Sequence, residues 1–235
     1  MQTGRATRHA SLCASCRLPM TLCICALVPQ LETRTRVVLL VPSGEARKQS
    51  NTGLLAARCL DGSTAQILRK RSGPMQAPII RNGELPLVLF PAPSASPITD
   101  YANSSQPIVL IVPDGSWHQA RAQQERGPLR RYPCVTLPSL GPSEYRLRSE
   151  PQLGGLATFE AIARALSILE GNRGGAISTA MLDVFRVMVE RTLWFRGKLR
   201  DHEVTGGIPG AALADDPRGI ATRAALSARA QARPD

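Results

Sequence analysis

The sequence predicts an α/β fold with a mostly parallel sheet and helices on both of its faces, preceded by a small N-terminal module with four cysteines. Short apolar runs alternate with helical patterns along the middle of the chain, which is typical of a parallel sheet. Four of the six cysteines lie within the first 25 residues. At 235 residues, the chain is long enough for one large domain with a real core, or for a domain with a small module.

Five apolar runs predict strands, because each run is short and ends at a proline, glycine or polar turn. These runs cover residues 37–41, 64–68, 85–90, 108–112 and 135–137. The stretch 91–107 is rich in proline, serine and alanine, which predicts a surface loop.

Helices are predicted between these strands and after the last of them. The expected helices begin after the capping sequence Asn51-Thr52-Gly53 and then cover 117–124, 157–170 and 178–196. From residue 197 onward large apolar side chains nearly vanish, which predicts a basic C-terminal tail that is flexible, or helical only on binding RNA. The predicted organisation is therefore a cysteine-rich module over 1–34, a catalytic α/β domain over 35–196 and a tail over 197–235.

The charge balance favours a polyanionic partner. Lysine and arginine exceed aspartate and glutamate by eleven, and nucleic acid is the commonest partner of so basic a chain, although a generally basic surface is the alternative. No run of 18 apolar residues is present, so we expect no membrane partner. The first twelve residues have no apolar stretch like that of a signal peptide, and we expect a cytoplasmic, reducing location.

The four N-terminal cysteines have the spacing of a structural metal site. Cys13, Cys16, Cys23 and Cys25 form the pattern C-x2-C-x6-C-x-C. Two close thiolate pairs can complete a tetrahedral zinc site with no position left for water, so the site is expected to support folding rather than catalysis. The alternative is that these cysteines are redox-inert or are grouped by chance. Cys59 and Cys134 lie in apolar surroundings and are predicted core residues.

The run from Ile108 to Arg121 carries the strongest sign of a functional site. A buried strand is followed by Asp114 and then Trp117, which begins a helix capped by Ser116 or by Asp114 itself. Polar residues also follow the other predicted strands, and the carboxyl ends of parallel strands form the usual ligand crevice. An ordinary strand-to-helix turn is the alternative. Phosphate-binding glycine motifs and a Ser-His-Asp arrangement are absent, and His118 is expected on a helix surface.

Six collinear motifs together resemble the DTW-domain family of tRNA-uridine aminocarboxypropyltransferases, over residues 13–195. They are the cysteine pattern, Glu45-x-Arg47 with Asn51-Thr52-Gly53, Leu89-Phe90-Pro91, Asp114-Gly115-Ser116-Trp117 with Gln119-Ala120-Arg121, Ser143-x-Tyr145-Arg146-Leu147-Arg148, and 155–161 (GLATFEA). Two positions depart from the family pattern: Ser116 replaces the threonine of Asp-x-Thr-Trp, and Pro42-Ser43 replaces a usual His-Pro. The departure at Pro42-Ser43 puts any role of that histidine in doubt.

The resemblance implies transfer of the 3-amino-3-carboxypropyl group of S-adenosylmethionine to N3 of a uridine in tRNA. It also implies a fold like the knotted SPOUT class of methyltransferases. Because the N3 proton must leave, a nearby carboxylate is needed as general base, and Asp114 is the candidate. Helix capping is the other possible role of Asp114, and the two roles are compatible.

The remaining motif residues are candidate binding residues. We expect S-adenosylmethionine to contact Leu89, Pro91, Asp114, Gly115, Ser116, Trp117, Tyr145 and Arg146, and the substrate to contact Glu45, Arg47, Asn51 and Arg148. Trp117 could stack on adenine or pack in the core. Arg146 and Arg148 could hold the cofactor carboxylate or tRNA phosphates.

Two other functions are compatible with parts of the sequence. The first is the same transfer onto rRNA, although the cysteine module belongs to the tRNA branch of the resemblance. The second is a zinc-stabilised RNA-binding protein without catalysis, which explains the charge and the cysteines but not the position of Asp114 and Trp117. No DNA partner is expected, and the sequence assigns no oligomeric state.

Overall fold

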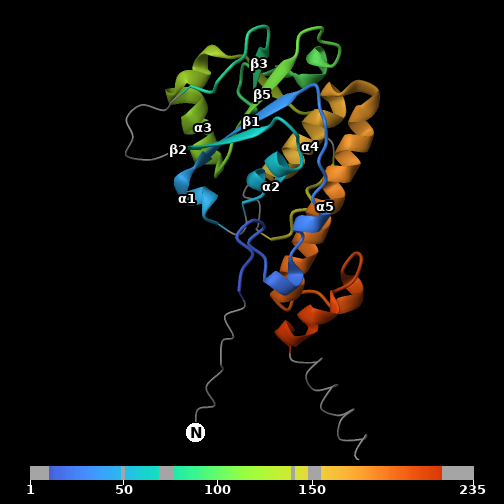
Figure 1. Cartoon of the computed structure of the whole chain (residues 1–235). Coiled ribbons are helices and arrows are strands. Elements are labelled where there is room, and N and C mark those ends of the chain that lie inside the picture. Colours follow the sequence, from blue (N-terminus) through green and yellow to red (C-terminus); the bar gives the residue numbers. More distant parts are fainter. Residues whose placement is uncertain (1–10, 49–50, 69–76, 139–140, 148–154, 219–235) are drawn as a thin grey trace, which may run out of the picture. The chain divides into compact units, whose positions relative to one another are not determined.

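The computed structural model describes residues 11–48, 51–68, 77–138, 141–147 and 155–218 of the chain (Figure 1). The chain forms two compact units. One unit is Val28–Phe185, and the other combines Met1–Leu27 with Arg186–Asp235. The predicted division into 1–34, 35–196 and 197–235 stays a prediction, because compactness alone does not show which segments fold independently.

The unit Val28–Phe185 is built on a six-stranded sheet in which every strand pair is parallel. Its strands are β1 (Arg36–Pro42), β2 (Thr64–Leu68), β3 (Leu85–Leu89), β4 (Ser96–Pro97), β5 (Ile108–Pro113) and β6 (Cys134–Thr136). They follow the order β2-β1-β5-β3-β6-β4 across the sheet. Each of the five predicted strands is present, with bounds that differ from the prediction by one residue at most.

Helices cover both faces of this sheet, as predicted. They are α1 (Ser43–Ala46), α2 (Gly53–Arg58), α3 (Trp117–Arg126), α4 (Thr158–Leu169) and the first part of α5 (Gly174–Phe195). Alternate residues of a strand point to opposite faces. Val38 and Leu40 pack with Ala120 of α3, whereas Leu39 lies against Gly53 of α2. The helices α2 and α3 therefore lie on opposite faces, as Figure 1 shows.

The neighbouring strands β1 and β5 form a topological switch point. The chain leaves β1 through α2 toward β2, and it leaves β5 through α3 toward β6, which lies on the other side of β5. The two connections run in opposite directions, and in open α/β sheets the carboxyl ends of the strands at such a point are the usual place for a ligand. This is the edge where the sequence predicts the functional site.

The predicted surface loop 91–107 contains a short edge strand. β4 pairs with β6, and the 3-10 helix η3 (Ile98–Tyr101) follows it directly. Ile98 is fully buried and so anchors this segment in the core. A proline is tolerated here because Pro97 lies in the outermost strand, where a missing N–H breaks no ladder. The abundance of proline in 91–107 predicts a loop, and for this reason β4 is not predicted from the sequence.

The second unit is formed by segments from the two ends of the chain. It contains the 3-10 helices η1 (Met20–Leu22), η2 (Cys25–Leu27), η6 (Asp201–Glu203) and η7 (Gly210–Asp215), together with the end of α5. Leu22, Ile24 and Trp194 are fully buried. None of the helices in the described residues is long and apolar enough to cross a membrane.

Part of the predicted flexible tail makes specific contacts within this unit. The indole Nε1 of Trp194 donates to Asp201 Oδ1 at 2.7 Å, and Arg218 forms ion pairs with Asp201 and Asp216. These contacts join polar groups, so they leave no apolar periodicity by which the sequence would reveal them. The rest of the predicted tail, 219–235, lies outside the described residues.

Candidate active site and metal centre

Asp114 lies directly after β5 at the switch point and is 4% exposed. Its two carboxylate oxygens accept hydrogen bonds from side chains on different elements. Asn51 Nδ2, before α2, donates to Oδ2 at 2.5 Å, and Thr158 Oγ1, at the start of α4, donates to Oδ1 at 2.6 Å. A carboxylate has about four lone-pair positions. Each oxygen of Asp114 therefore keeps room for one further partner beside these two.

The backbone of Asp114 is also fixed on both sides. Its N–H donates to the carbonyl oxygen of Leu40 in β1 at 2.9 Å, and its own carbonyl accepts from Gln123 Nε2 of α3 at 2.9 Å. A β-carbon on Gly53 would lie 3.3 Å from Asp114 Cγ and 2.9 Å from the Leu39 side chain. Glycine at position 53 thus lets α2 approach the strand end closely.

Ser116, and not Asp114, caps helix α3. Ser116 Oγ accepts from the N–H of Gln119 at 3.3 Å, and the Gln119 side chain accepts from the N–H of Ser116 at 2.8 Å, which together form a capping box. Gly115 has a φ of +118°, and a β-carbon there would lie 2.7 Å from Gln119 Oε1. The turn therefore requires glycine, and the Asp114 carboxylate is left for other contacts.

Replacement of Ser116 by alanine should lower stability through loss of this cap. We expect Ser116→Ala to lower the free energy of unfolding by about 1 kcal/mol, as is usual for loss of an N-cap hydroxyl. Ser116→Thr keeps the hydroxyl and serves as the matched control, with stability near that of the original protein. Urea unfolding of the three proteins measures the difference. Equal midpoints for Ser116→Ala and the original protein would contradict the capping role.

Trp117 packs in the core, one of the two roles that the sequence leaves open. Its ring is half-buried and lies against Phe90, which follows β3, with ring centroids 6.2 Å apart. Leu89 is buried at the end of β3, and Pro91 beyond it is exposed. Because β3 lies next to β5, these residues share one sheet edge with Asp114. Contact of Trp117, Leu89 and Pro91 with S-adenosylmethionine stays a prediction.

The segment 143–147 is attached to the start of α4 by a buried carboxylate. Glu160 is 1% exposed and accepts hydrogen bonds from Ser143 Oγ at 2.6 Å, from the N–H of Glu144 at 2.7 Å and from the N–H of Ala157 at 2.9 Å. The next residue, Tyr145, is buried, and Arg146 after it is exposed. The anchored segment thus holds both predicted binding residues next to α4.

The aromatic ring of Tyr145 belongs to a stack in the core. It lies 5.9 Å from the ring of Phe185 in α5, and Phe185 lies 4.8 Å from Phe159 in α4. Both pairs are stacked, a favourable arrangement for aromatic side chains. The ring of Tyr145 therefore has a packing role in addition to the binding role predicted for this residue.

The predicted substrate residues have different surroundings. Asn51 belongs to the Asp114 cluster, and its Oδ1 accepts from the N–H of Leu54 at 3.0 Å, so its amide is held at both ends. Glu45 is buried and pairs with Lys48 at 2.6 Å, whereas Arg47 is exposed. Of the predicted binding residues, Arg148 lies outside the described part of the chain.

The sequence predicts no role for Thr158 and Glu160, which bind the two parts of this site: Thr158 contacts Asp114, and Glu160 contacts the segment 143–147. Thr158 and Glu160 lie in the motif 155–161, but polar residues at a helix start are usually read as ordinary caps. Their partners Asp114 and Ser143 are 44 and 17 residues away in sequence. The only available signal was the motif itself, because neither pairing leaves a local pattern.

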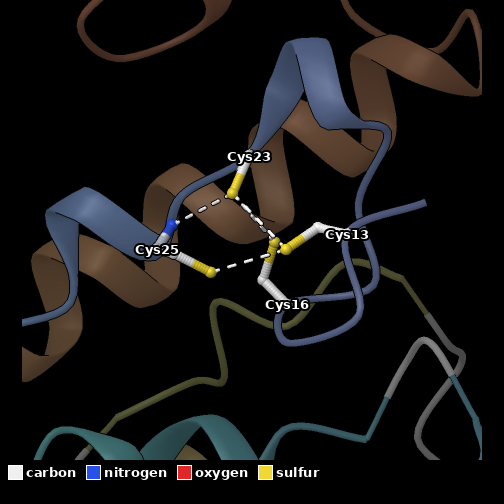
Figure 2. Close-up of side chains that lie close together, drawn as sticks. All are labelled: Cys13, Cys16, Cys23 and Cys25. Atoms are coloured by element: carbon white, nitrogen blue, oxygen red, sulfur yellow. Dashed lines mark hydrogen bonds between the residues drawn. The ribbon is translucent and has the colours of Figure 1, made fainter. Parts of the chain in front are cut away.

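The four N-terminal cysteines converge on one point, as predicted. Figure 2 shows their sulfur atoms directed toward one another, and all four lie within 4.8 Å of each other. The Sγ–Sγ distances are 3.6 Å for Cys13 and Cys25, 3.6 Å for Cys13 and Cys23, and 3.7 Å for Cys16 and Cys23. A zinc ion with Zn–S bonds of about 2.3 Å requires tetrahedral edges of about 3.8 Å. The four thiols therefore fit a tetrahedral metal ion.

The surroundings of the cluster act differently on its thiols. The N–H groups of Cys16 and Ser15 lower the pKa of the Cys13 thiol to about 6, whereas burial raises the pKa of the Cys16 thiol, and burial together with the neighbouring thiols raises that of Cys23 to about 12. The N–H of Cys25 donates to Cys23 Sγ at 3.5 Å. Buried Arg191 of α5 donates to the carbonyl oxygens of Leu22 and Cys23 at 3.2 and 3.0 Å. One guanidinium beside the cluster would partly offset the negative charge of metal-bound thiolates.

The other two cysteines are core residues, as predicted. Cys59 and Cys134 are buried, and all six cysteines have free thiols. Burial raises the pKa of the Cys59 thiol to about 12. His118 is exposed on α3, also as predicted. The cysteine cluster is thus chemically distinct from the remaining thiols of the chain.

Comparison with known proteins agrees with these features. The DTW domain model matches residues 10–193. The chain is 28% identical over 166 residues to tRNA-uridine aminocarboxypropyltransferase 2 of Drosophila melanogaster and 31% identical over 170 residues to that of Macaca fascicularis. These matches cover 67% and 68% of this chain, but only 66% and 57% of the respective relatives.

A plant relative is matched over more of its length. The chain is 26% identical over 216 residues to tRNA-uridine aminocarboxypropyltransferase A of Arabidopsis thaliana, a match that covers 78% of this chain and 81% of the relative. No solved structure matches the chain significantly. Since the domain match extends over most of the sequence and includes both the cysteine cluster and Asp114, the chain belongs to the DTW domain family.

Proposed function

We propose that this chain transfers the 3-amino-3-carboxypropyl group of S-adenosylmethionine to N3 of a uridine in tRNA. The names of its relatives support the transferred group and the tRNA substrate. The observation that carries the proposal is the buried carboxylate of Asp114, held by Asn51 and Thr158 at the switch point of a parallel sheet. Such an edge is where open α/β sheets bind small molecules.

Asp114 acts as the general base in the proposed reaction. When bound, S-adenosylmethionine supplies an electrophilic γ-carbon: N3 of uridine forms the new bond to it, and the C–S electron pair stays on sulfur, which leaves as neutral 5′-methylthioadenosine. The N3 proton passes to an Asp114 oxygen. Asn51 and Thr158 donate to the carboxylate from two sides and so fix its direction. Fixed orientation of a base relative to its proton contributes much of the rate.

Side chains after β3 and β6 suit the donor molecule. The methionine part of S-adenosylmethionine carries a carboxylate, and the exposed guanidinium of Arg146 is complementary to it. Leu89 and Pro91 offer apolar contacts at the end of β3. We propose Glu45, Arg47 and Arg148 as tRNA contacts.

The cysteine cluster is proposed as a structural zinc site. Cys13, Cys16, Cys23 and Cys25 would complete four-coordination, which leaves no open position for a reacting water. The ion would stabilise a short segment that has few buried apolar side chains, among them Leu18, Leu22 and Ile24. We also propose that the catalytic unit has the SPOUT-like fold that the family resemblance implies.

Mass spectrometry of nucleosides from cells with and without the gene tests this function. We expect aminocarboxypropyl-uridine to disappear from tRNA and to return with a plasmid copy of the gene. Loss of the nucleoside from rRNA instead would show the rRNA reaction. Unchanged nucleosides in both RNAs, with RNA binding retained by the purified chain, would indicate a non-catalytic RNA-binding protein.

A further inference from the structure

We propose that the first turn of α4 positions both halves of the active site, Thr158 through Asp114 and Glu160 through the segment 143–146. This inference rests on the proposed function, because it assigns separate effects on chemistry and on donor binding. The two residues are separated by Phe159 alone, so one helical turn joins the strand end of β5 to the loop that follows β6.

Thr158 and Asn51 each donate a hydrogen bond to a different oxygen of the Asp114 carboxylate. The Thr158 hydroxyl donates to Oδ1 at 2.6 Å, while Asn51 donates to Oδ2 at 2.5 Å. The orientation of the Asn51 amide follows from its second contact: Oδ1 accepts from the backbone N–H of Leu54, so the NH2 group faces Asp114. With one donor on each oxygen, rotation of the carboxylate breaks at least one short hydrogen bond. Among the described residues, removal of the Thr158 hydroxyl leaves Asn51 as the side-chain donor to this carboxylate.

Glu160 holds the loop through both of its oxygens. Oε2 accepts from Ser143 Oγ and from the N–H of Ala157, and Oε1 accepts from the N–H of Glu144. The carboxylate is 1% exposed, so these hydrogen bonds are shielded from water and are stronger than surface contacts. Because Tyr145 and Arg146 follow directly, the position of Glu160 sets where these two residues lie.

Phe159, which lies between Thr158 and Glu160, contacts both the segment before α2 and the aromatic stack that contains Tyr145. The Phe159 ring stacks on Phe185, and Phe185 stacks on Tyr145. The N–H of Phe159 points to Thr52 Oγ1 at 3.4 Å, before α2. Helix starts normally use their first side chains to satisfy their own N–H groups. Here Thr158 donates to Asp114 after β5, and two of the three hydrogen bonds that Glu160 accepts come from residues 143 and 144. The side chains of this turn therefore contact the site more than they cap the helix.

Separate kinetic effects test this inference. We expect Thr158→Val to lower kcat about 10- to 100-fold, the scale of a misdirected catalytic group, with the dissociation constant of S-adenosylmethionine within threefold of the original value. Thr158→Ser, which restores a hydroxyl, should recover most of kcat. Glu160→Gln should weaken S-adenosylmethionine binding about 10-fold and raise its KM in proportion, with kcat changed less than threefold. Isothermal titration calorimetry and steady-state kinetics give the two quantities.

Matched variants separate positioning from a general loss of structure. Ser167→Ala removes a hydroxyl of the same helix that donates within its own turn, to the carbonyl oxygen of Arg164, and should leave both quantities unchanged. If Glu160→Gln fails to fold, Ser143→Ala removes one of the three donors and should weaken binding in the same direction by a smaller factor.

The outcomes distinguish this inference from the function beneath it. An original protein that neither binds S-adenosylmethionine nor modifies tRNA overturns the proposed function, and the inference with it. An active original protein with variants that lower kcat and binding together, or that change neither, overturns the inference alone. The expected split between Thr158 and Glu160 supports it, because a merely structural role of α4 would affect both quantities alike.

Discussion

Asp114→Asn is expected to abolish transfer while the chain still folds and binds S-adenosylmethionine. An amide cannot take the N3 proton, and loss of a general base lowers kcat by about 10²- to 10⁴-fold. The neighbouring Thr158 hydroxyl can turn to accept a hydrogen bond from the new NH2 group, so the local packing is kept. Single-turnover assays with purified tRNA measure the rate, and calorimetry measures donor binding.

The free energy of unfolding of Asp114→Asn must be measured beside its activity. We expect Asp114→Asn to lower the free energy of unfolding by about 1–3 kcal/mol, because Asn51 and Thr158 both donate to the original carboxylate. Transfer must therefore be measured well below the melting temperature of the variant. A variant with transfer within threefold of the original rate would show that Asp114 only joins α2, α4 and β5.

Loss of the cysteine cluster is expected to cause the largest change in stability. Purified protein should contain one zinc ion per chain, and Cys13→Ser combined with Cys16→Ser should lose it. Structural zinc contributes about 10–16 kcal/mol of binding free energy in small zinc modules, which is comparable to the whole stability of a domain. We expect the double variant to be poorly soluble. A protease should cleave its N-terminal segment before it cleaves the rest of the chain.

Metal analysis together with thiol titration measures this effect. Chelation should expose four additional thiols for each zinc released, while Cys59, whose thiol pKa is raised to about 12 by burial, stays unreactive until the chain unfolds. Cys59→Ala is the matched control, since it removes a thiol outside the cluster and should retain the zinc. Original protein that is free of zinc, or a double variant that keeps it, would contradict the assignment.

Much of the sheet could be predicted because its strands are short apolar runs. The run 108–112 has five consecutive apolar residues and forms β5, the central strand. β4 could not be predicted in this way, since Ser96 and Pro97 have low strand propensity and are held there by pairing with β6 and by burial of Ile98. Helix α5 begins at Gly174, before its predicted start, because two glycines mask the helical pattern.

The sequence predicts site residues that directly follow strands. It does not predict the contacts that these residues make with other segments of the chain. The position of Asp114 after a buried strand and the cysteine spacing both appear directly in the sequence. The choice of Ser116 as helix cap, and the contacts of Thr158 and Glu160, depend on distances between segments far apart in the chain. Such pairings follow from strand order, which the local pattern of residues does not encode.

The most direct measurement uses the purified chain, tRNA and two labelled forms of S-adenosylmethionine. One form carries ¹³C in the aminocarboxypropyl carbons, and the other carries it in the methyl group. We predict that the first label, and not the second, appears in a tRNA uridine carrying a substituent on N3, and that Asp114→Asn prevents its appearance. Label transferred from the methyl group, or no label in tRNA from either form, would contradict the account.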